Sequence, residues 1–335
     1  MYHARFKGNY YDTGYKWGRL LLEHGKTLEH CPTFTPDDSV RAFAQQCKTE
    51  YAKHYPQLLE EIQGIADGQK LPAGVLESIL FPMYSMRFEN RCTCFAYFTA
   101  EETVFARNSD FLVSIEKLYM NCLYQLDGAY AFNGNTTAYV EMEDGVNEHG
   151  LAAGLCFVYP KLHRPGFNAG MLIRYILERC KTTDEAIAAL KSLPISSAQT
   201  ITLADQGGAI AVVECNPEKL VVIKPETGGN FVAAANCFVS PEMQPYRNTE
   251  VDDWRADDRY HTAYTALANH PEQRSVAFMQ DILAGKYGFM CQYDRKANAD
   301  TVWSVVYNLT KKQVWRAEGN PSRKAFKEDT RMQLR

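Results

Sequence analysis

The chain has 335 residues, of which 46% are hydrophobic and 23% charged, and these proportions are typical of a folded soluble protein. Its net charge of −4 provides no basic surface for neutralising phosphates, so we expect no nucleic-acid partner. No apolar run reaches the length of a membrane span, and the first residues lack the apolar stretch of a signal peptide. We therefore expect a cytoplasmic protein without a membrane span.

The ten cysteines are scattered and contain no Cys-x-x-Cys pair, which argues against a disulfide scaffold, a zinc ribbon and a thioredoxin motif. Cys92 and Cys94 form a Cys-x-Cys pair without a nearby partner cluster, so a redox or metal protein remains only an alternative hypothesis. The chain also lacks nucleotide-binding glycine motifs, His-Glu-x-x-His and Gly-x-Ser-x-Gly. We therefore expect no cofactor and no metal.

The first part of the chain, up to residue 91, has apolar residues at helical spacing. Asp12 is a candidate N-cap for the first helix, and Pro56 fits the first turn of the third helix. The predicted helices cover residues 11–29, 36–54, 56–68 and 72–88, and residues 36–39 open the second of them.

After residue 91 the pattern changes to strands that pair locally. We predict strands over residues 92–98, 103–111, 119–126, 138–141, 151–158, 200–204, 209–214, 220–223, 231–236, 301–309 and 313–316. Helices are predicted over residues 168–180, 183–193, 257–268 and 274–284. Two helices between groups of locally paired strands indicate an α+β fold with antiparallel sheets covered by helices.

The first predicted hairpin carries the residues most suited to chemistry. If residues 99–102 form its turn, Cys92 lies opposite Asp110, and a thiol, the Arg107 guanidinium and a carboxylate converge at its open end. Nearby positive charge favours a thiolate, which is the reactive form of cysteine. The alternative is ordinary: a core cysteine and a structural Arg–Asp pair. We expect Cys94 to lie on the opposite face of the strand from Cys92 and to be core.

These residues also carry a resemblance to a known family. Cys-Thr-x-Phe at residue 92, followed by Arg-Asn-x-Asp-Phe at residue 107, resembles the start of the catalytic domain of N-terminal-nucleophile (Ntn) amide hydrolases. The similarity is to the choloylglycine hydrolase superfamily, and within it to the acyl-CoA:6-aminopenicillanic acid acyltransferase-like branch. Further similar segments occur at residues 7–18, 55–68, 144–151 and 212–214.

The resemblance implies a four-layer αββα Ntn-hydrolase sandwich preceded by an N-terminal helical segment. It implies self-cleavage of the Arg91–Cys92 bond, which would divide the chain into a pro-segment of residues 1–91 and a catalytic domain of residues 92–335. The mature enzyme would cleave linear amide C–N bonds or transfer acyl groups through a Cys92 thioester. Its expected partners are an acyl amide or acyl thioester substrate and its own cleaved N-terminal segment, and homo-oligomerisation is left open.

The resemblance also assigns roles. Cys92 is the expected nucleophile, with its freed α-amino group as the base, and Asn236 the expected oxyanion donor. Asp110 would hold the amine, Arg107 would orient the carboxylate and the thiolate, and Arg259 matches a late family arginine. Asparagine often forms turns, which is the ordinary alternative for Asn236, and Arg255 competes with Arg259 as the matching arginine.

The chain departs from its relatives in two places. Arg91 precedes the expected cleavage point where some relatives have Gly or Met, and Cys156 stands where bile-salt hydrolases have Asn. A non-catalytic, unprocessed binding protein is therefore kept as an alternative. Aromatic residues that are candidates either for an apolar acyl pocket or for the core are Tyr84, Phe88, Tyr124, Tyr130, Phe132, Phe157 and Tyr159.

Overall fold

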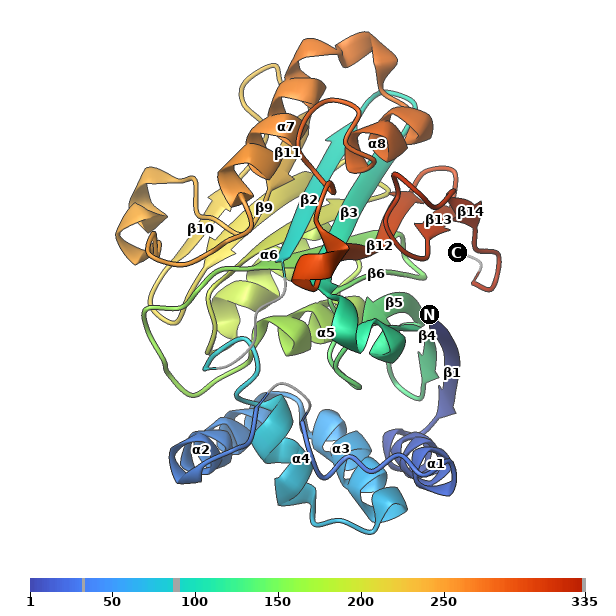
Figure 1. Cartoon of the computed structure of the whole chain (residues 1–335), viewed down its shortest axis with the longest axis vertical. Helices are drawn as coiled ribbons and strands as arrows, with labels where there is room; N and C mark the ends of the chain where they lie inside the picture. Colours follow the sequence, from blue (N-terminus) through green and yellow to red (C-terminus); the bar gives the residue numbers. More distant parts are fainter. Residues whose placement is uncertain (32–33, 87–90, 333–335) are drawn as a thin grey trace.

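The computed structural model describes residues 1–31, 34–86 and 91–332, and it contains two β-sheets with helices packed against them (Figure 1). The larger sheet has eight strands in the order β1-β4-β5-β6-β7-β8-β9-β10. Its strands are β1 (Tyr2–Gly8), β4 (Met120–Leu126), β5 (Phe132–Thr136), β6 (Asp144–Asn147), β7 (Leu151–Phe157), β8 (Gln199–Asp205), β9 (Ile210–Cys215) and β10 (Leu220–Ile223). β1 pairs with β4 in parallel, and the other neighbours pair antiparallel.

The smaller sheet has six antiparallel strands in the order β11-β2-β3-β12-β13-β14. They are β11 (Phe231–Ala234), β2 (Arg91–Phe98), β3 (Thr103–Leu112), β12 (Ala299–Asn308), β13 (Gln313–Ala317) and β14 (Lys327–Glu328). Short 3-10 helices connect elements of both sheets: η1 (Val113–Leu118), η2 (Pro241–Tyr246), η3 (Pro271–Gln273) and η4 (Arg295–Ala297).

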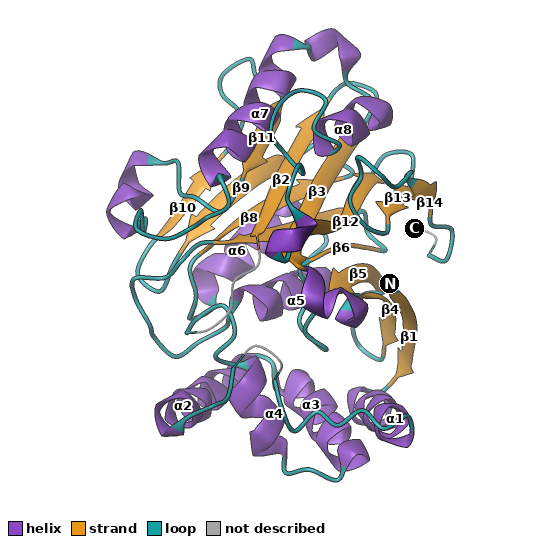
Figure 2. Ribbon diagram, in the orientation of Figure 1, coloured by secondary structure: helices purple, strands orange, loops and turns teal. Residues whose placement is uncertain are grey.

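Helices cover both sheets, and the sheets contact each other (Figure 2). α5 (Ala169–Arg179) and α6 (Thr183–Ser192) contact strands of the larger sheet, whereas α7 (Ala256–Asn269) and α8 (Val276–Leu283) contact strands of the smaller one. One hydrophobic cluster joins β2 and β3 to β6 and β7, and it includes Cys92, Cys94, Val146 and Cys156. The thiol of Cys92 is therefore buried between the sheets.

The N-terminal helices gather at one end of the molecule, drawn in blue in Figure 1. They are α1 (Tyr10–Glu23), α2 (Asp38–His54), α3 (Pro56–Gln69) and α4 (Ala73–Leu80). Asn9 and Asp37 cap α1 and α2 by accepting from backbone amides of the first turn. α1 and α3 cross at backbone contact, because a Cβ built at Gly64 would meet the backbone oxygen of Tyr11.

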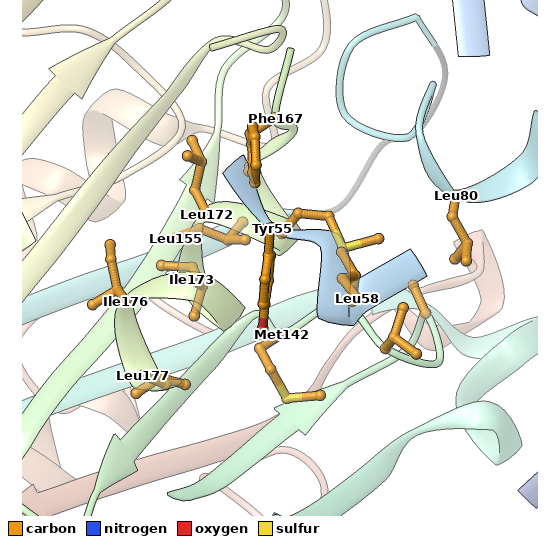
Figure 3. Packing of buried hydrophobic residues seen from close by; sticks show 14 of the residues in the cluster. Tyr55, Leu58, Leu80, Met142, Leu155, Phe167, Leu172, Ile173, Ile176 and Leu177 are labelled. Carbon is orange, nitrogen blue, oxygen red and sulfur yellow. The ribbon is translucent and has the colours of Figure 1, made fainter. Parts of the chain in front are cut away.

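The N-terminal helices share a core with the rest of the chain. Tyr55 and Leu58 lie in the same hydrophobic cluster as Phe167 and Leu172, which belong to α5 and the segment before it (Figure 3). A buried ion-pair network crosses the same boundary and is centred on Arg174 of α5, whose Nη2 lies 2.8 Å from a carboxylate oxygen of Glu61 in α3.

The N-terminal part is not only helical, which corrects the prediction for residues 1–91. Residues 2–8 form β1 and extend the larger sheet from Tyr2, paired with Met120, to Gly8, paired with Leu126. Only Phe6 of this strand is buried, so its sequence carries too little apolar alternation to identify it. The division into a pro-segment and a catalytic domain stays a prediction.

Most predicted elements of the C-terminal part are confirmed to within a few residues, with one clear error. Residues 138–141 form a turn rather than a strand, with Tyr139 at φ 56°, and the strands β5 and β6 flank it. These two strands escaped prediction because they contain Asn133, Gly134, Asn135 and Gly145, and both residue types are uncommon in strands.

Smaller differences concern the N-terminal helices. α1 is capped by Asn9 rather than Asp12 and ends at Glu23, and α4 ends at Leu80. The last residues of the predicted helix 72–88 lie outside the described residues. Within the described ranges, no helix has the length and apolarity needed to cross a membrane.

Candidate active site

The hairpin of β2 and β3 forms around the predicted turn, but its register differs by one residue from the prediction. Because Phe98 pairs with Thr103 beside the turn, Cys92 lies opposite Ser109, and Asp110 lies opposite Arg91. A one-residue slip moves side chains to the other face of the sheet. The prediction that Cys92 faces Asp110 is therefore wrong.

The position predicted for Cys94 is also wrong. Side chains two residues apart share a face of a strand, so Cys94 points toward the larger sheet together with Cys92. Its thiol contacts the Cys156 thiol, with the sulfurs 3.6 Å apart, and both residues are fully buried. All ten cysteines are described and are free thiols. Among the described residues, no cluster of three or more His, Cys, Asp or Glu is arranged to hold a metal ion.

Arg107 is brought to the Cys92 thiol, as the sequence predicts. Its Nη2 donates to Cys92 Sγ at 2.6 Å and to Glu143 Oε2 at 3.2 Å, and its Nη1 donates to Asp144 Oδ2 at 2.8 Å. Its Nε donates to the backbone oxygen of Leu155 at 3.1 Å. Two carboxylates and a carbonyl thus fix the guanidinium with one nitrogen aimed at the sulfur.

The electrostatic environment keeps the thiol protonated in the intact chain. Burial raises the pKa of Cys92 well above its usual value, and its hydrogen bond with Cys156 raises it further, while the positive charge of Arg107 lowers it. A guanidinium beside the sulfur stabilises negative charge as it develops. The arrangement suits a thiol that loses its proton during a reaction rather than beforehand.

Asn236 and Arg259 meet at the backbone of Cys92. Cys92 N donates to Asn236 Oδ1 at 2.7 Å, and Arg259 Nη1 donates to the Cys92 carbonyl oxygen at 2.6 Å. Arg259 Nη2 also donates to Asn236 Oδ1 at 3.0 Å, and Asn236 Nδ2 donates to the oxygen of Phe157 at 2.6 Å. Arg255 instead pairs with Asp258 near the surface, so of the two candidate arginines the fold brings Arg259 to Cys92.

Asp110 lies on the other face of the hairpin, among partners that the sequence did not indicate. Its oxygens accept from Thr301 Oγ1 at 2.5 Å and from Tyr293 at 3.0 Å, and one of them lies 3.7 Å from Arg259 Nη1. Burial raises the pKa of Asp110 to about 6, although Arg259 opposes the shift. Asp110 is therefore linked to Cys92 indirectly, through Arg259, which contacts both residues. The backbone nitrogen of Cys92 donates to Asn236 and not to Asp110.

Sequence reasoning missed the acidic partners of Arg107. Glu143 accepts from Ser109 Oγ at 2.9 Å and from Thr137 Oγ1 at 2.7 Å, in addition to Arg107. Asp144 accepts from Trp303 Nε1 at 2.9 Å and belongs to a segment, 144–151, that carries the family resemblance. That resemblance was the available signal, but it assigned Asp144 no role.

The aromatic candidates for an acyl pocket divide into groups. Tyr124 and Phe132 pack against Arg174, whose Cζ lies 3.9 Å and 5.3 Å from their ring centroids, so they belong to the core. Phe157 contacts both Tyr84 and Tyr159. Tyr130 packs against His149 and Lys181, and Phe88 lies outside the described residues.

The comparisons with known proteins identify the family. The sequence model of acyl-coenzyme A:6-aminopenicillanic acid acyl-transferase matches residues 98–323. The chain belongs to this family. The matched range covers more than half of the chain, so the recognition made from the sequence motifs is confirmed. It begins after Cys92, so it does not test the expected nucleophile. Among curated protein sequences, none matches the chain.

Solved structures of other proteins resemble the fold of this family member. A mutant of the conjugated bile acid hydrolase from Clostridium perfringens aligns with a TM-score of 0.52 at 16% identity, covering 72% of this chain and 94% of that one. Penicillin V acylase from Agrobacterium tumefaciens gives a TM-score of 0.46 at 19% identity, with 68% and 83% covered. The N-acylethanolamine-hydrolyzing acid amidase orthologue from Caenorhabditis elegans gives 0.48 at 19%, with 65% and 93% covered. At 16% identity, the similarity to the bile acid hydrolase concerns the fold alone.

Proposed function

We propose that the chain is a self-processing enzyme with an N-terminal cysteine nucleophile, which hydrolyses linear amides or transfers acyl groups through a thioester on Cys92. The observation that carries the proposal is the 2.6 Å hydrogen bond from Arg107 Nη2 to Cys92 Sγ in a member of an acyltransferase family. Glu143 and Asp144 pair with the buried guanidinium and hold its Nη2 against the sulfur, where a positive charge favours the thiolate as it forms.

Self-cleavage would begin with attack of Cys92 Sγ on the carbonyl carbon of Arg91. The C–N bond between the two residues breaks as the acyl group moves to sulfur, and the thiol proton passes to the leaving nitrogen. Water then hydrolyses the thioester, which leaves a carboxylate on Arg91 and a free amine on Cys92. In this scheme Arg107 stabilises the developing thiolate.

The freed amine changes the acid–base chemistry at the thiol. An α-amino group has a pKa of about 7.7–8.0, so near neutral pH it can accept the thiol proton during attack on a substrate carbonyl. Asn236 Oδ1 already accepts from the Cys92 nitrogen and Arg259 donates to the Cys92 carbonyl oxygen, which supports a role for both in orienting the freed residue. Asn236 is also the proposed donor to the oxyanion, an interaction that typically contributes about 10²–10³ in rate.

The proposed architecture follows the family: two helices, the larger sheet, the smaller sheet and two further helices, stacked as an αββα sandwich. The contacts of α5 and α6 with one sheet and of α7 and α8 with the other support this order. We further propose that residues 1–91 stay bound after cleavage as a small chain, since they share a core and a strand with residues 92–335.

A second function is favoured by one observation. The Cys92 thiol is fully buried and its pKa is raised, as it would be in an unprocessed relative that binds a ligand without catalysis. Such a protein would keep the Arg91–Cys92 bond intact and would not react with alkylating reagents.

The mass of the purified protein distinguishes the self-processing enzyme from the unprocessed binding protein. We expect fragments corresponding to residues 1–91 and 92–335 in the wild type, an intact chain for Cys92→Ala, and normal cleavage for Cys94→Ala, which removes a buried thiol two residues away. Processed protein should hydrolyse members of a panel of acyl amides, and the Cys92→Ala variant should not. If the Cys92→Ala chain were still cleaved and active, the proposal would be wrong.

A further inference from the structure

The side chain of Arg91 occupies a site built for a cation. Its Nη2 donates to the hydroxyl of Tyr159 and, at 2.6 Å, to the backbone oxygen of Asp252. Its Cζ lies 4.8 Å from the ring centroid of Tyr159 and 5.5 Å from that of Trp254. Arg91 is only 1% exposed, whereas both aromatic residues are partly exposed. Two partly exposed aromatic rings, a hydroxyl and a carbonyl surround a buried guanidinium.

This cation site is tied directly to the nucleophile by Arg259. The guanidinium of Arg259 donates to the backbone oxygens of Asp253, at 2.8 Å, and Trp254, at 3.0 Å. The same guanidinium donates to the Cys92 carbonyl oxygen. The loop that carries Trp254 is therefore held in a fixed position relative to Cys92.

The position of Arg91 relates this site to acyl transfer. In the proposed self-cleavage, the first acyl group transferred to Cys92 Sγ is the arginyl group of residue 91. The residues that bind its side chain therefore bind the side chain of an acyl group whose carbonyl carbon lies within reach of the sulfur. After cleavage, departure of Arg91 from these residues would leave the same partners to an incoming substrate.

We propose that Tyr159, Trp254 and the backbone oxygen of Asp252 form the acyl-group subsite, and that the substrates carry a positively charged group on the acyl side of the amide. This inference rests on the proposed function. In the corresponding reaction, Cys92 Sγ forms a bond with the acyl carbon, the amide C–N bond breaks, and the leaving amine takes the thiol proton. Water then releases the cationic acid from the thioester.

Three coumarin amides test the proposal, with the acyl groups Nα-acetyl-L-arginyl, Nα-acetyl-L-citrullyl and Nα-acetyl-L-norleucyl, in which the acetyl group removes the charge of the α-amine. Citrulline keeps the length and planarity of arginine without its charge, and norleucine keeps only the apolar chain. The enzyme is the full chain after cleavage has been verified by intact mass, and an identically prepared Cys92→Ala protein supplies the background rate. We expect kcat/KM for the arginyl amide to exceed that for the citrullyl amide about tenfold, as loss of cation–π contacts implies.

Variants assign this preference to the site. Trp254→Leu and Tyr159→Phe should each lower the arginyl-to-citrullyl ratio, and the second removes only a hydroxyl, so it keeps the ring and the packing. Tyr130→Leu is the matched control, because it removes a ring lying 5.6 Å from Lys181 Nζ in another part of the chain and should leave the ratio unchanged.

The outcomes separate this inference from the proposed function. A chain that is never cleaved before Cys92 would overturn the proposed function and the inference with it. A cleaved protein that prefers the norleucyl amide, that treats arginyl and citrullyl amides alike, or that hydrolyses none of the three would overturn the cation subsite alone. An arginyl preference that survives both site variants would also refute it.

Discussion

Replacing Arg174 with Met should strongly destabilise the intact chain. Arg174 is fully buried, with Nη2 2.8 Å from Glu61, Nε 2.5 Å from Glu178 and Nη1 3.0 Å from the oxygen of Val140. The replacement leaves two buried carboxylates without their cation, and breaking a buried pair in this way costs about 3–5 kcal/mol. That is a large fraction of the roughly 5–15 kcal/mol by which folded proteins are stable.

Urea unfolding in a Cys92→Ala background measures the effect, because every molecule then has the same covalent structure. Burial already raises the pKa of Glu61, and removal of Arg174 raises it further. When the folded-state pKa of a carboxyl is raised, the folded state loses stability as pH rises, because the carboxyl must ionise at an unfavourable site. The stability lost through Arg174→Met should therefore be greater at pH 8 than at pH 5. Adding Glu61→Gln and Glu178→Gln to Arg174→Met removes the uncompensated charges and should restore much of the stability.

Two results would refute this reasoning. The first is a loss below about 1 kcal/mol for Arg174→Met at pH 8, which would mean that the carboxylates find other partners or water. The second is a triple variant no more stable than the single one, which would show that packing of the arginine stem, rather than charge, sets the cost.

Gly64→Ala should force α1 and α3 apart and destabilise the protein by about 1–3 kcal/mol. Gly74→Ala is the control: no atom lies within 4 Å of the added carbon, so it should stabilise the protein by about 0.5–1 kcal/mol. Equal shifts in melting temperature would contradict the crossing geometry. Because the pKa of Asp110 is raised from 3.8 to about 6, its contribution to stability falls as pH rises through that interval, by about 3 kcal/mol. Asp110→Asn should therefore gain stability relative to the wild type between pH 4 and pH 7 in urea unfolding, and a constant difference would argue against a shifted pKa. Glu143→Gln removes a charged hydrogen bond that holds the Arg107 guanidinium beside the Cys92 thiol, and it should slow the proposed self-cleavage at least about tenfold in a time course. Glu141→Gln is the control and should not slow it. Equal slowing by both variants would indicate a merely structural effect.

Local signals in the sequence were sufficient to predict the hairpin that carries Cys92 and Arg107. The turn at residues 99–102 and the alternating residues around it specify two antiparallel strands, and the structure contains both. The register required one more fact, the pairing of Phe98 with Thr103, and the one-residue error placed Asp110 on the wrong face. Arg107 still reaches the thiol because it pairs with Cys94, which shares a face with Cys92, so that Arg107 is a diagonal neighbour of Cys92.

The polar part of the site could not be predicted from local pattern. Glu143 meets Arg107 across the two sheets, and the strand that begins at Asp144 is rich in residues that favour turns. Asn133 and Asn135 occupy a strand because their side chains bind Asn121 from the neighbouring strand, with donor–acceptor distances of 2.7 Å and 2.8 Å. These hydrogen bonds exist only after the sheet has formed, so intrinsic β propensity gives no sign of them.

The placement of the partners of Cys92 has a consequence for the order of events during protein synthesis. Cys92 is made early, but its partners follow it along the chain: Arg107 contacts its thiol, and Asn236 and Arg259 contact its backbone. Asn236 and Arg259 follow by more than half of the remaining length. A ribosome releases them only after most of the chain has emerged. The bond before Cys92 therefore cannot meet its assembled surroundings while most of the chain is still unmade. If the proposed self-cleavage occurs, translation delays it until the polypeptide can fold around residues 1–91 and 92–335.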